Sequence, residues 1–325
     1  MLADSGAMAE ARTVEPANLR TVATGLRFPE GPIAMDDGSV LLVEIARGTL
    51  TRVTPDGAAT VVAQCGGGPN GAAIGPDGAA YVCNNGGCFD WQERLGLLFP
   101  GSPPPATWNG GSLQRVDLAT GEVTTLLTES GGVPLRAPND LVVDADGGIW
   151  FTDHGVRQDR TSDRTGFHWC QADGSDAREV TSPLDAPNGI GLSPAGDHVY
   201  VAETHTGRLH VWDVTGPGQV DTQDLVGGPG GRLLGDPGGG ALFDSLAVDG
   251  EGWVCVATLG TSPGITAFSP DGGQVEYTPL PDPLTTNICF GPDGRTAYVT
   301  LSGTGQLVAF DWPRPGGTTA FTARR

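Results

Sequence analysis

The chain has 325 residues, of which 38% are hydrophobic and 17% charged, so it is long enough to bury a sizeable core within one large domain. Its 18 Lys and Arg residues against 38 Asp and Glu give a formal net charge of -20, which argues against nucleic acid and anionic membrane surfaces as partners. No apolar run long enough to span a membrane and no secretory leader is visible, so we expect a cytoplasmic protein.

Short strands joined by tight turns are predicted along most of the chain. The 52 glycines and 26 prolines exceed ordinary usage without a collagen period, which is typical of an all-β domain rich in turns. We expect residues 1–16 to be a flexible N-terminal segment and residues 17–325 to form a single domain. The sequence leaves open whether Met1 or Met8 starts the chain in the cell.

A 16-residue segment recurs six times without gaps, as in PNDLVVDADGGIWFTD, and each copy has glycine at its tenth position. Glycine accepts the positive φ of a tight hairpin turn, so each copy predicts two strands joined by a turn. The first strand alternates apolar residues, as at Leu141 and Val143, which is the period of a half-buried strand. The copies begin at Pro29, Pro69, Pro138, Pro187, Phe243 and Thr285.

A third strand follows most copies, as in GRLHVWDVTG, and a weaker fourth strand follows some, as in ATVVAQ. Such units cannot cover their own faces, so we predict a six-bladed β-propeller of four-stranded antiparallel blades. The last copy lacks a clear fourth strand, and we expect the N-terminal strand in NLRTVATGL to close that blade. Residues 89–111, which include a proline run, and residues 154–165 are predicted loops on one face of the disc.

The second residue of each copy is polar and lies just ahead of the predicted first strand, and pseudo-sixfold symmetry would gather these residues near the axial channel. The set offers carboxylates, carboxamides and a hydroxyl, which are the donors that Ca²⁺ or another oxygen-binding divalent cation prefers. The alternative is that they only form Asx-type turns between blades, although that use does not explain a glutamate in the first copy. They are Glu30, Asn70, Asn139, Asn188, Asp244 and Thr286.

Several of these motifs occur together in one known family. These motifs are FPEGP, PNGAA, PNDLVVDADGGIWFTD, PNGIGLSP followed by YVAET, DSLAVD and TTNICFGPDGRTAYVT. Together, from about Phe28 to Trp312, they resemble the senescence-marker-protein, gluconolactonase and luciferin-regenerating-enzyme family. The resemblance implies a six-bladed propeller with one catalytic divalent cation in the channel. Its ligands would be Glu30, Asn188 and Asp244, and Asn139 would contact the substrate.

The sequence also departs from that family. Sugar-lactonase members often have an arginine two residues before the substrate-contacting asparagine, where this chain has Ala137, with Arg136 one position further back. Ser245 stands where many relatives have glycine, so it adds a hydroxyl to the predicted substrate pocket. Asp140 either reaches the cation through water or caps its strand. Asn70 and His154 are further candidates for substrate binding, although His154, like His205, also fits a purely structural role.

These residues predict a metal-dependent hydrolase that opens a lactone or a related small-molecule ester. A divalent cation with open coordination positions polarises a carbonyl and lowers the pKa of a water, and Asp244 is the expected general base. Ca²⁺ is expected first, with Mg²⁺, Mn²⁺, Zn²⁺ or Fe²⁺ as alternatives, in a monomer or small homo-oligomer. The other functions left open are phosphotriester hydrolysis with the same cation, and a non-hydrolytic or ligand-binding propeller.

Overall fold

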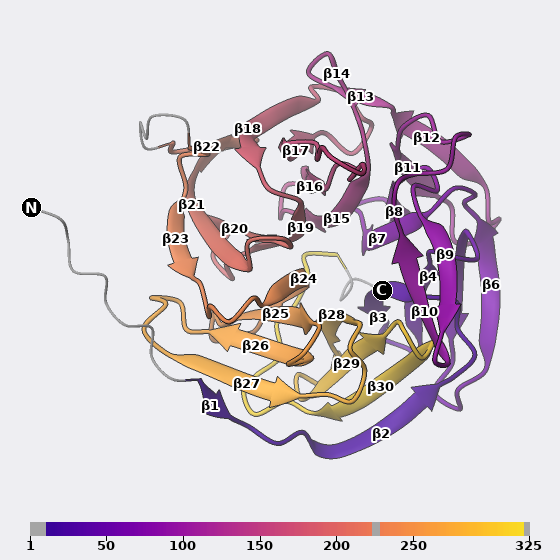
Figure 1. The fold of residues 1–325 in the computed structure, drawn as a ribbon, viewed down its shortest axis with the longest axis vertical. Helices are drawn as coiled ribbons and strands as arrows, with labels where there is room; N and C mark the ends of the chain where they lie inside the picture. Colours follow the sequence, from indigo (N-terminus) through magenta and orange to yellow (C-terminus); the bar gives the residue numbers. More distant parts are fainter. Residues whose placement is uncertain (1–10, 223–227, 322–325) are drawn as a thin grey trace, which may run out of the picture.

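The computed structural model describes residues 11–222 and 228–321. Over these ranges the chain forms strands and turns without a helix, so no helix there is able to cross a membrane. Six antiparallel sheets surround a central axis as the blades of a disc (Figure 1). The predicted all-β, six-bladed propeller is therefore confirmed.

Each blade begins with the strand nearest the axis and ends with the strand at the rim. The first three blades are β3 (Pro29–Ala34), β4 (Val40–Glu44), β5 (Thr49–Val53) and β6 (Ala59–Gln64); β7 (Pro69–Ile74), β8 (Ala80–Asn84), β11 (Ser112–Val116) and β12 (Val123–Leu127); and β15 (Pro138–Val143), β16 (Ile149–Asp153), β17 (Thr165–Cys170) and β18 (Arg178–Leu184). Each first and second strand is the hairpin of one sequence repeat.

The remaining blades follow the same plan with additions at the rim. They are β19 (Pro187–Leu192), β20 (His198–Glu203) and β21 (Arg208–Gly216), with β22 (Gln219–Val220) and β23 (Arg232–Gly235) both paired to β21; β24 (Leu242–Val248), β25 (Val254–Leu259), β26 (Gly264–Phe268) and β27 (Val275–Pro279); and β28 (Thr285–Phe290), β29 (Thr296–Leu301), β30 (Gln306–Asp311) and β2 (Ala17–Ala23).

The N-terminal strand closes the last blade. β2 pairs antiparallel with β30, with Arg20 opposite Ala309, so the outer edge of β30 is covered as predicted. Further upstream, β1 (Arg12–Thr13) pairs in parallel with β27. The segment expected to be flexible thus includes a short strand, residues 1–10 lie outside the described residues, and the domain boundary stays a prediction.

The core lies between blades, because each sheet covers the apolar face of the next. Leu41 and Val43 of the first blade pack with Ile74 and Val82 of the second in one buried cluster, and similar clusters join the other blades. Alternating side chains of a strand point to opposite faces, so one strand contributes to the clusters on both sides of its blade. This packing fixes where each first strand begins.

The insert at residues 89–111 was predicted as a loop, and that was wrong for its first half. β9 (Asp90–Arg94) and β10 (Leu97–Gly101) form an antiparallel hairpin, and the prolines follow it. The hairpin gains apolar contacts outside its own blade, because the Trp91 ring lies 4.9 Å from that of Phe28. A second small hairpin, β13 (Glu129–Ser130) with β14 (Val133–Pro134), also lies outside the blades.

The two faces of the disc differ. We call the face where the first strands begin the upper face, and the face that carries the repeat turns the lower face. After β30, residues 312–321 run along the lower face: Gly316 N donates to Gly294 O at 2.9 Å, and Gly250 N donates to Pro315 O at 2.8 Å. Phe321 packs against the clusters of the first three blades.

Candidate active site

The six first strands contact one another in a closed ring around the axis, and this ring brings the second residues of the repeats together (Figure 1). In every repeat the pairing of first and second strand shifts register at this point, as a β-bulge does. The second residue therefore lies within the first strand rather than just ahead of it. Bulges re-aim side chains and are frequent beside active sites.

Glycine at the third position of three repeats lets neighbouring first strands approach closely. At Gly31, with φ +52°, an added Cβ would lie 2.7 Å from Ala72 N, and at Gly189 it would lie 2.6 Å from Leu246 N. Both contacts are too short for any side chain. Glycine is thus required where one first strand passes against the next, and this spacing narrows the ring of polar side chains.

Three acidic side chains interact within this ring. Burial, opposed by hydrogen bonds from Asn287, Gly31 and Thr286, raises the pKa of Glu30 to about 7. Burial and then the Glu30 charge raise the pKa of Asp140 to about 8. The pKa of Asp244 is raised well above its usual range by burial first and then by Glu30, with Asp140 as a smaller cause. The ring thus holds acids that favour their neutral forms unless positive charge is supplied.

Hydrogen bonds fix the carboxylate of the first blade. Glu30 Oε2 accepts from Asn287 Nδ2 and from Gly31 N, both at 2.9 Å. Asn287 belongs to the sixth blade, so this contact spans the closure of the propeller. The sequence did not point to Asn287, because it stands at the third position of its repeat, where the other copies have glycine, aspartate or serine and share no ligand type.

The fourth and fifth blades meet through a short polar chain. Asn188 Nδ2 donates to Thr204 Oγ1 at 3.1 Å, and Ser245 Oγ donates to Asn188 Oδ1 at 3.3 Å. Asn188 also hydrogen-bonds the Asp244 carboxylate and thereby lowers its pKa, against the larger effect of burial. The structure thus brings Asn188, Asp244 and Ser245 together, as the sequence predicted.

Two ring amides remain available to a ligand. Within the described residues, the side-chain amides of Asn70 and Asn139 have no hydrogen-bond partner in the protein, although both residues are buried. The hydroxyl of Thr286, by contrast, is hydrogen-bonded to the hydroxyl of Thr300, with the two oxygens 2.9 Å apart. Asp140 caps its own strand, because its Oδ1 accepts from Leu141 N at 2.9 Å, so one of the two roles considered for it is observed.

His154 follows β16 on the upper face. Burial lowers the pKa of His154 to about 4, so its imidazole is neutral near pH 7. Its neighbour is His205, with ring centroids 5.7 Å apart in an edge-to-face arrangement, and His205 Nδ1 lies 3.1 Å from Asp185 Oδ1. The two histidines that the sequence suggested thus lie together, although neither is bonded to a ring residue.

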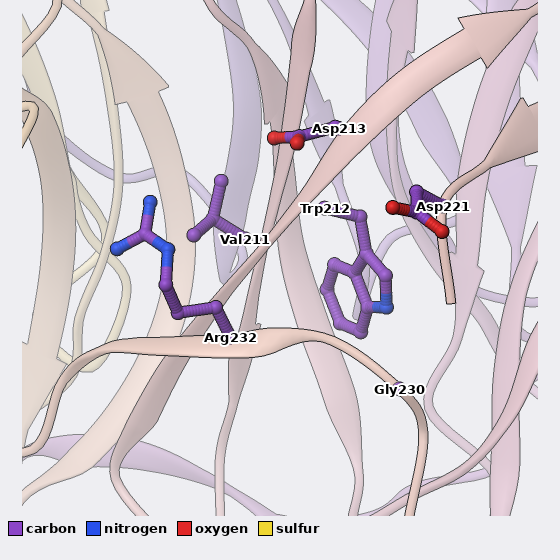
Figure 2. Close-up of a pocket in the computed structure, with 6 residues that line it drawn as sticks. All are labelled: Val211, Trp212, Asp213, Asp221, Gly230 and Arg232. Carbon is purple, nitrogen blue, oxygen red and sulfur yellow. The ribbon is translucent and has the colours of Figure 1, made fainter. Parts of the chain in front are cut away.

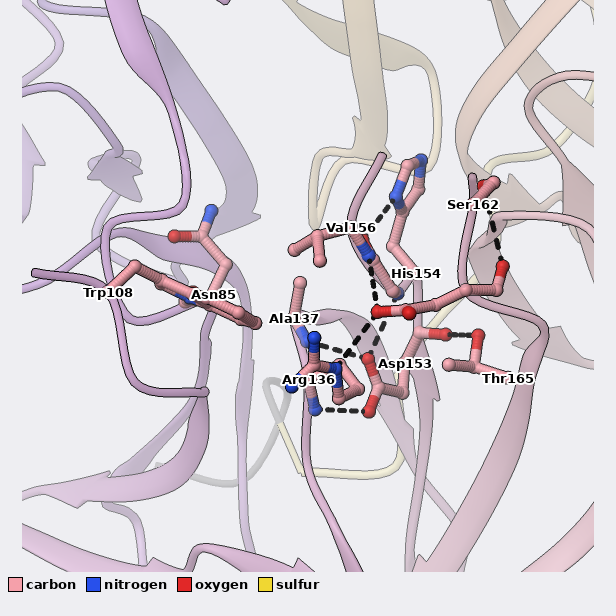
Figure 3. Close-up of polar contacts among 11 residues, drawn as sticks. Asn85, Trp108, Arg136, Ala137, Asp153, His154, Val156, Ser162 and Thr165 are labelled. Atoms are coloured by element: carbon pink, nitrogen blue, oxygen red, sulfur yellow. Dashed lines mark hydrogen bonds and ion pairs between the residues drawn. The ribbon is translucent and has the colours of Figure 1, made fainter. Parts of the chain in front are cut away.

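The arginine near the substrate-contacting position is held away from Asn139. Arg136 Nε donates to Asp163 Oδ2 at 2.9 Å, and its guanidinium stacks on Trp108 at 4.6 Å (Figure 3). Its backbone is fixed as well, because Arg136 N and Ala137 N both donate to the Asp153 carboxylate at 2.7 Å. Arg136 therefore does not replace the arginine that is absent at Ala137.

Two other features lie apart from the ring. Figure 2 shows a hollow at the outer strands of the fourth blade, lined by Trp212, Asp213, Asp221 and Arg232 among others. No group of three or more His, Cys, Asp or Glu side chains in residues 11–222 and 228–321 is arranged to hold a metal. The predicted ligand set contains only two such residues, with Asn188 as the third.

Known proteins share this architecture. A gluconolactonase from Xanthomonas campestris superposes with a TM-score of 0.70 at 23% identity, covering 91% of this chain and 89% of that one. Regucalcin from Agrobacterium tumefaciens, described as a calcium-binding protein, superposes with a TM-score of 0.71 at 18% identity, covering 95% and 98%. At these identities the two structures support the fold alone.

Sequence comparison adds two curated relatives. The gluconolactonase of Zymomonas mobilis is 25% identical over 316 residues, which cover 87% of this chain and 79% of that protein. Diisopropyl-fluorophosphatase of Loligo vulgaris is 28% identical over 199 residues, which cover 58% of this chain and 61% of that protein. The model of the SMP-30/gluconolactonase/LRE-like region matches residues 28–303, so the chain belongs to that family.

Proposed function

We propose that this protein is a lactone hydrolase that works with one divalent cation held by Glu30, Asn188 and Asp244. The observation that carries the proposal is the cluster of three acidic side chains in the ring, whose pKa values are raised by burial and, for Asp140 and Asp244, also by the charge of Glu30. Buried carboxylates without a counter-charge are costly. A divalent cation offsets that cost.

The donor set fits such a cation. Carboxylate and carboxamide oxygens are the ligands of Ca²⁺ and other hard cations, and Ca²⁺ is therefore our first candidate. Asn188 is oriented by Thr204 and Ser245, and Glu30 is oriented by Asn287, so ligand positions are set before a cation arrives. A cation bound there would polarise a lactone carbonyl and lower the pKa of a water.

The remaining steps fall to side chains of the chain itself. Asp244 would accept a proton from the attacking water, because the positive charge of the cation would keep its carboxylate ionised despite burial. The amides of Asn139 and Asn70 would orient the substrate, because they have no partner among the described residues.

Three further side chains have secondary roles in this proposal. Ser245 would position Asn188 and border the pocket, and Asp140 would tune the charge of the ring. His154, which is neutral near pH 7, would line the upper face and donate or accept a hydrogen bond.

The relatives support a small-molecule lactone or ester as the substrate. The gluconolactonase relative covers most of the chain, which favours lactone hydrolysis. Diisopropyl-fluorophosphatase matches over a shorter stretch, and it favours a second candidate, hydrolysis of a phosphorus ester at the same ring.

A substrate panel tests the proposal. Lactones, aryl esters and a phosphotriester would be assayed by pH-stat with added Ca²⁺ or Mn²⁺, with chelator, and with Asp244→Asn as the matched variant. We expect lactone hydrolysis that chelator abolishes and cation restores. Activity that survives exhaustive chelation would contradict the cation, and preference for the phosphotriester would favour the second candidate.

A further inference from the structure

The upper face carries an apolar surface that the proposed chemistry leaves without a role. Its members are aromatic or aliphatic, come from the first three blades and their connecting segments, and surround the start of β3 and β15; we call them the apolar arc. They are Phe28, Phe89, Trp91, Trp108, Ala137 and Val156.

The β9–β10 hairpin supplies the middle of the arc. It leaves the second blade and reaches two others, because Leu98 N donates to Gly303 O of the sixth blade at 2.9 Å. Glu93 pairs with Arg27 of the first blade at 3.0 Å. Within the hairpin region, the rings of Phe89 and Trp91 lie 5.5 Å apart. The hairpin is thus anchored across the upper face rather than projecting into solvent.

The arc lies directly beside ring residues. Phe28 precedes Glu30 by two positions, and its ring contacts Trp91. Ala137 likewise precedes Asn139 by two positions and is buried with Val156 against Phe89 and Trp108. Since Phe89 packs in both clusters, the apolar surface is continuous from the first blade to the third.

The arc leaves apolar surface accessible. Phe89, Trp91 and Trp108 are only half-buried, so part of each ring can meet a ligand. The positive charge of Arg136 does not make this surface more polar, because its guanidinium is hydrogen-bonded to Asp163 and stacked on Trp108. A hydroxyl-rich ligand would lose hydrogen bonds to water against such a surface.

One buried donor interrupts the arc. Asn85 is 1% exposed, its Oδ1 accepts from Gly87 N at 2.9 Å, and its Nδ2 has no partner in the described part of the chain. Its amide packs on Gly68, two residues before Asn70, where an added Cβ would lie 2.1 Å from Asn85 Oδ1. Figure 3 shows Asn85 and Trp108 on one side, with Ala137 and Val156 on the other.

We infer that the apolar arc selects lactones or esters that carry an alkyl or aryl substituent rather than hydroxylated sugar lactones. The inference rests on the proposed hydrolysis and names its substrate class. The substituent lies along the accessible parts of the Trp91 and Trp108 rings. On such a surface each buried methylene group of the substrate strengthens binding, whereas its hydroxyl groups find no hydrogen-bond partner.

Three lactones with the same six-membered ring test the inference: δ-decalactone, δ-valerolactone and glucono-δ-lactone, assayed with Ca²⁺ or Mn²⁺ and corrected for spontaneous opening. We expect kcat/KM for δ-decalactone to exceed that for each of the others by about tenfold or more. A higher value for glucono-δ-lactone overturns the inference but leaves lactone hydrolysis standing. Hydrolysis of none of the three by folded, cation-supplied protein contradicts the proposed function itself.

Variants locate the preference. Trp91→Ala and Trp108→Ala should lower the ratio of δ-decalactone to δ-valerolactone by about fivefold or more, and Trp91→Phe should restore most of it. Leu95→Ala is the matched control, because Leu95 lies fully exposed at the tip of the same hairpin and should leave the ratio unchanged. If Trp91→Ala slows both substrates equally, the hairpin acts only as a support and the inference is wrong.

Discussion

Acidic side chains are buried both in the ring and on the lower face of the propeller; of these two groups, within the described residues, arginine pairs with the one on the lower face. There, Arg314 Nε donates to Asp249 Oδ2 at 2.6 Å and Nη1 to Glu276 Oε2 at 2.5 Å, while the guanidinium stacks on Trp253 at 4.1 Å. On the upper side, Glu30, Asp140 and Asp244 meet one another instead.

The pKa values record this difference. Burial alone would raise the pKa of Glu276, but hydrogen bonds from Arg12 and Arg314 outweigh it and the pKa is lowered. Burial raises the pKa of Glu30 to about 7 and that of Asp140 to about 8. The acids of the lower face thus have a cationic partner within the chain, whereas the three acids of the ring have none among the described residues, and the proposed cation would supply that charge.

Breaking the lower face should cost the most stability. Arg314→Leu leaves Asp249 and Glu276 without their common partner in a buried setting, and we expect the free energy of unfolding to fall by about 3–5 kcal/mol. Urea denaturation measures it. Arg115→Leu, which removes the more exposed pair with Asp77, should cost about 1 kcal/mol or less, and equal losses in the two variants would contradict the comparison.

Changing the ring should instead affect turnover. Asp244→Asn keeps an oxygen donor but loses charge and basicity, so kcat on the best lactone should fall by about 100-fold or more even at saturating cation. Circular dichroism and the melting temperature would show that the variant is folded. Near wild-type kcat in a folded variant would remove Asp244 as the base.

The acids of the ring also predict a pH dependence. Because the folded-state pKa of Asp140 is raised to about 8, the folded protein holds a proton that the unfolded chain loses near pH 4. The stability due to this proton is complete below about pH 4 and is lost as pH rises toward 8. In chelator, Asp140→Asn should therefore gain stability relative to wild type by about 5 kcal/mol between pH 4 and 8. A flat difference would mean that Asp140 is not perturbed.

Asn139→Ala should give the smallest effect. It removes an amide that has no partner among the described residues, so we expect kcat/KM to fall by about tenfold with cation affinity within a few-fold of wild type. Steady-state kinetics and a cation titration on the same sample separate the two. An equally large loss of cation affinity would reassign Asn139 to the ligand set.

The sequence predicted the blades because the repeat carries its own local signals. Glycine at the tenth position of each copy sets the turn, and the alternating apolar residues set the buried faces. The same repeat predicted that Glu30, Asn188 and Asp244 would meet, because equivalent positions of a closed propeller share one level. The pairing of β2 with β30 could be predicted because the sequence has one strand without a partner before the first repeat and a last repeat without a clear fourth strand.

Other features depend on contacts between segments that do not repeat. The β9–β10 hairpin is held by Phe28 and Gly303, which lie far away in sequence, and the proline run beside it suggested a loop. Asn287 reaches Glu30 only because the ring closes. Arg314, which decides the character of the lower face, follows the last repeat and has no equivalent in the other copies.

Calorimetric titration with Ca²⁺ tests the central claim most directly, which is that the ring holds one divalent cation. With chelator-treated protein at pH 8, we predict one bound Ca²⁺ per chain, and Glu30→Gln should weaken its binding by about tenfold or more, since a carboxylate ligand is lost. Glu276→Gln, on the lower face, should leave the affinity unchanged. Absence of a binding site for Ca²⁺, and likewise for Mg²⁺ and Mn²⁺, or binding that Glu30→Gln does not weaken, would contradict the account.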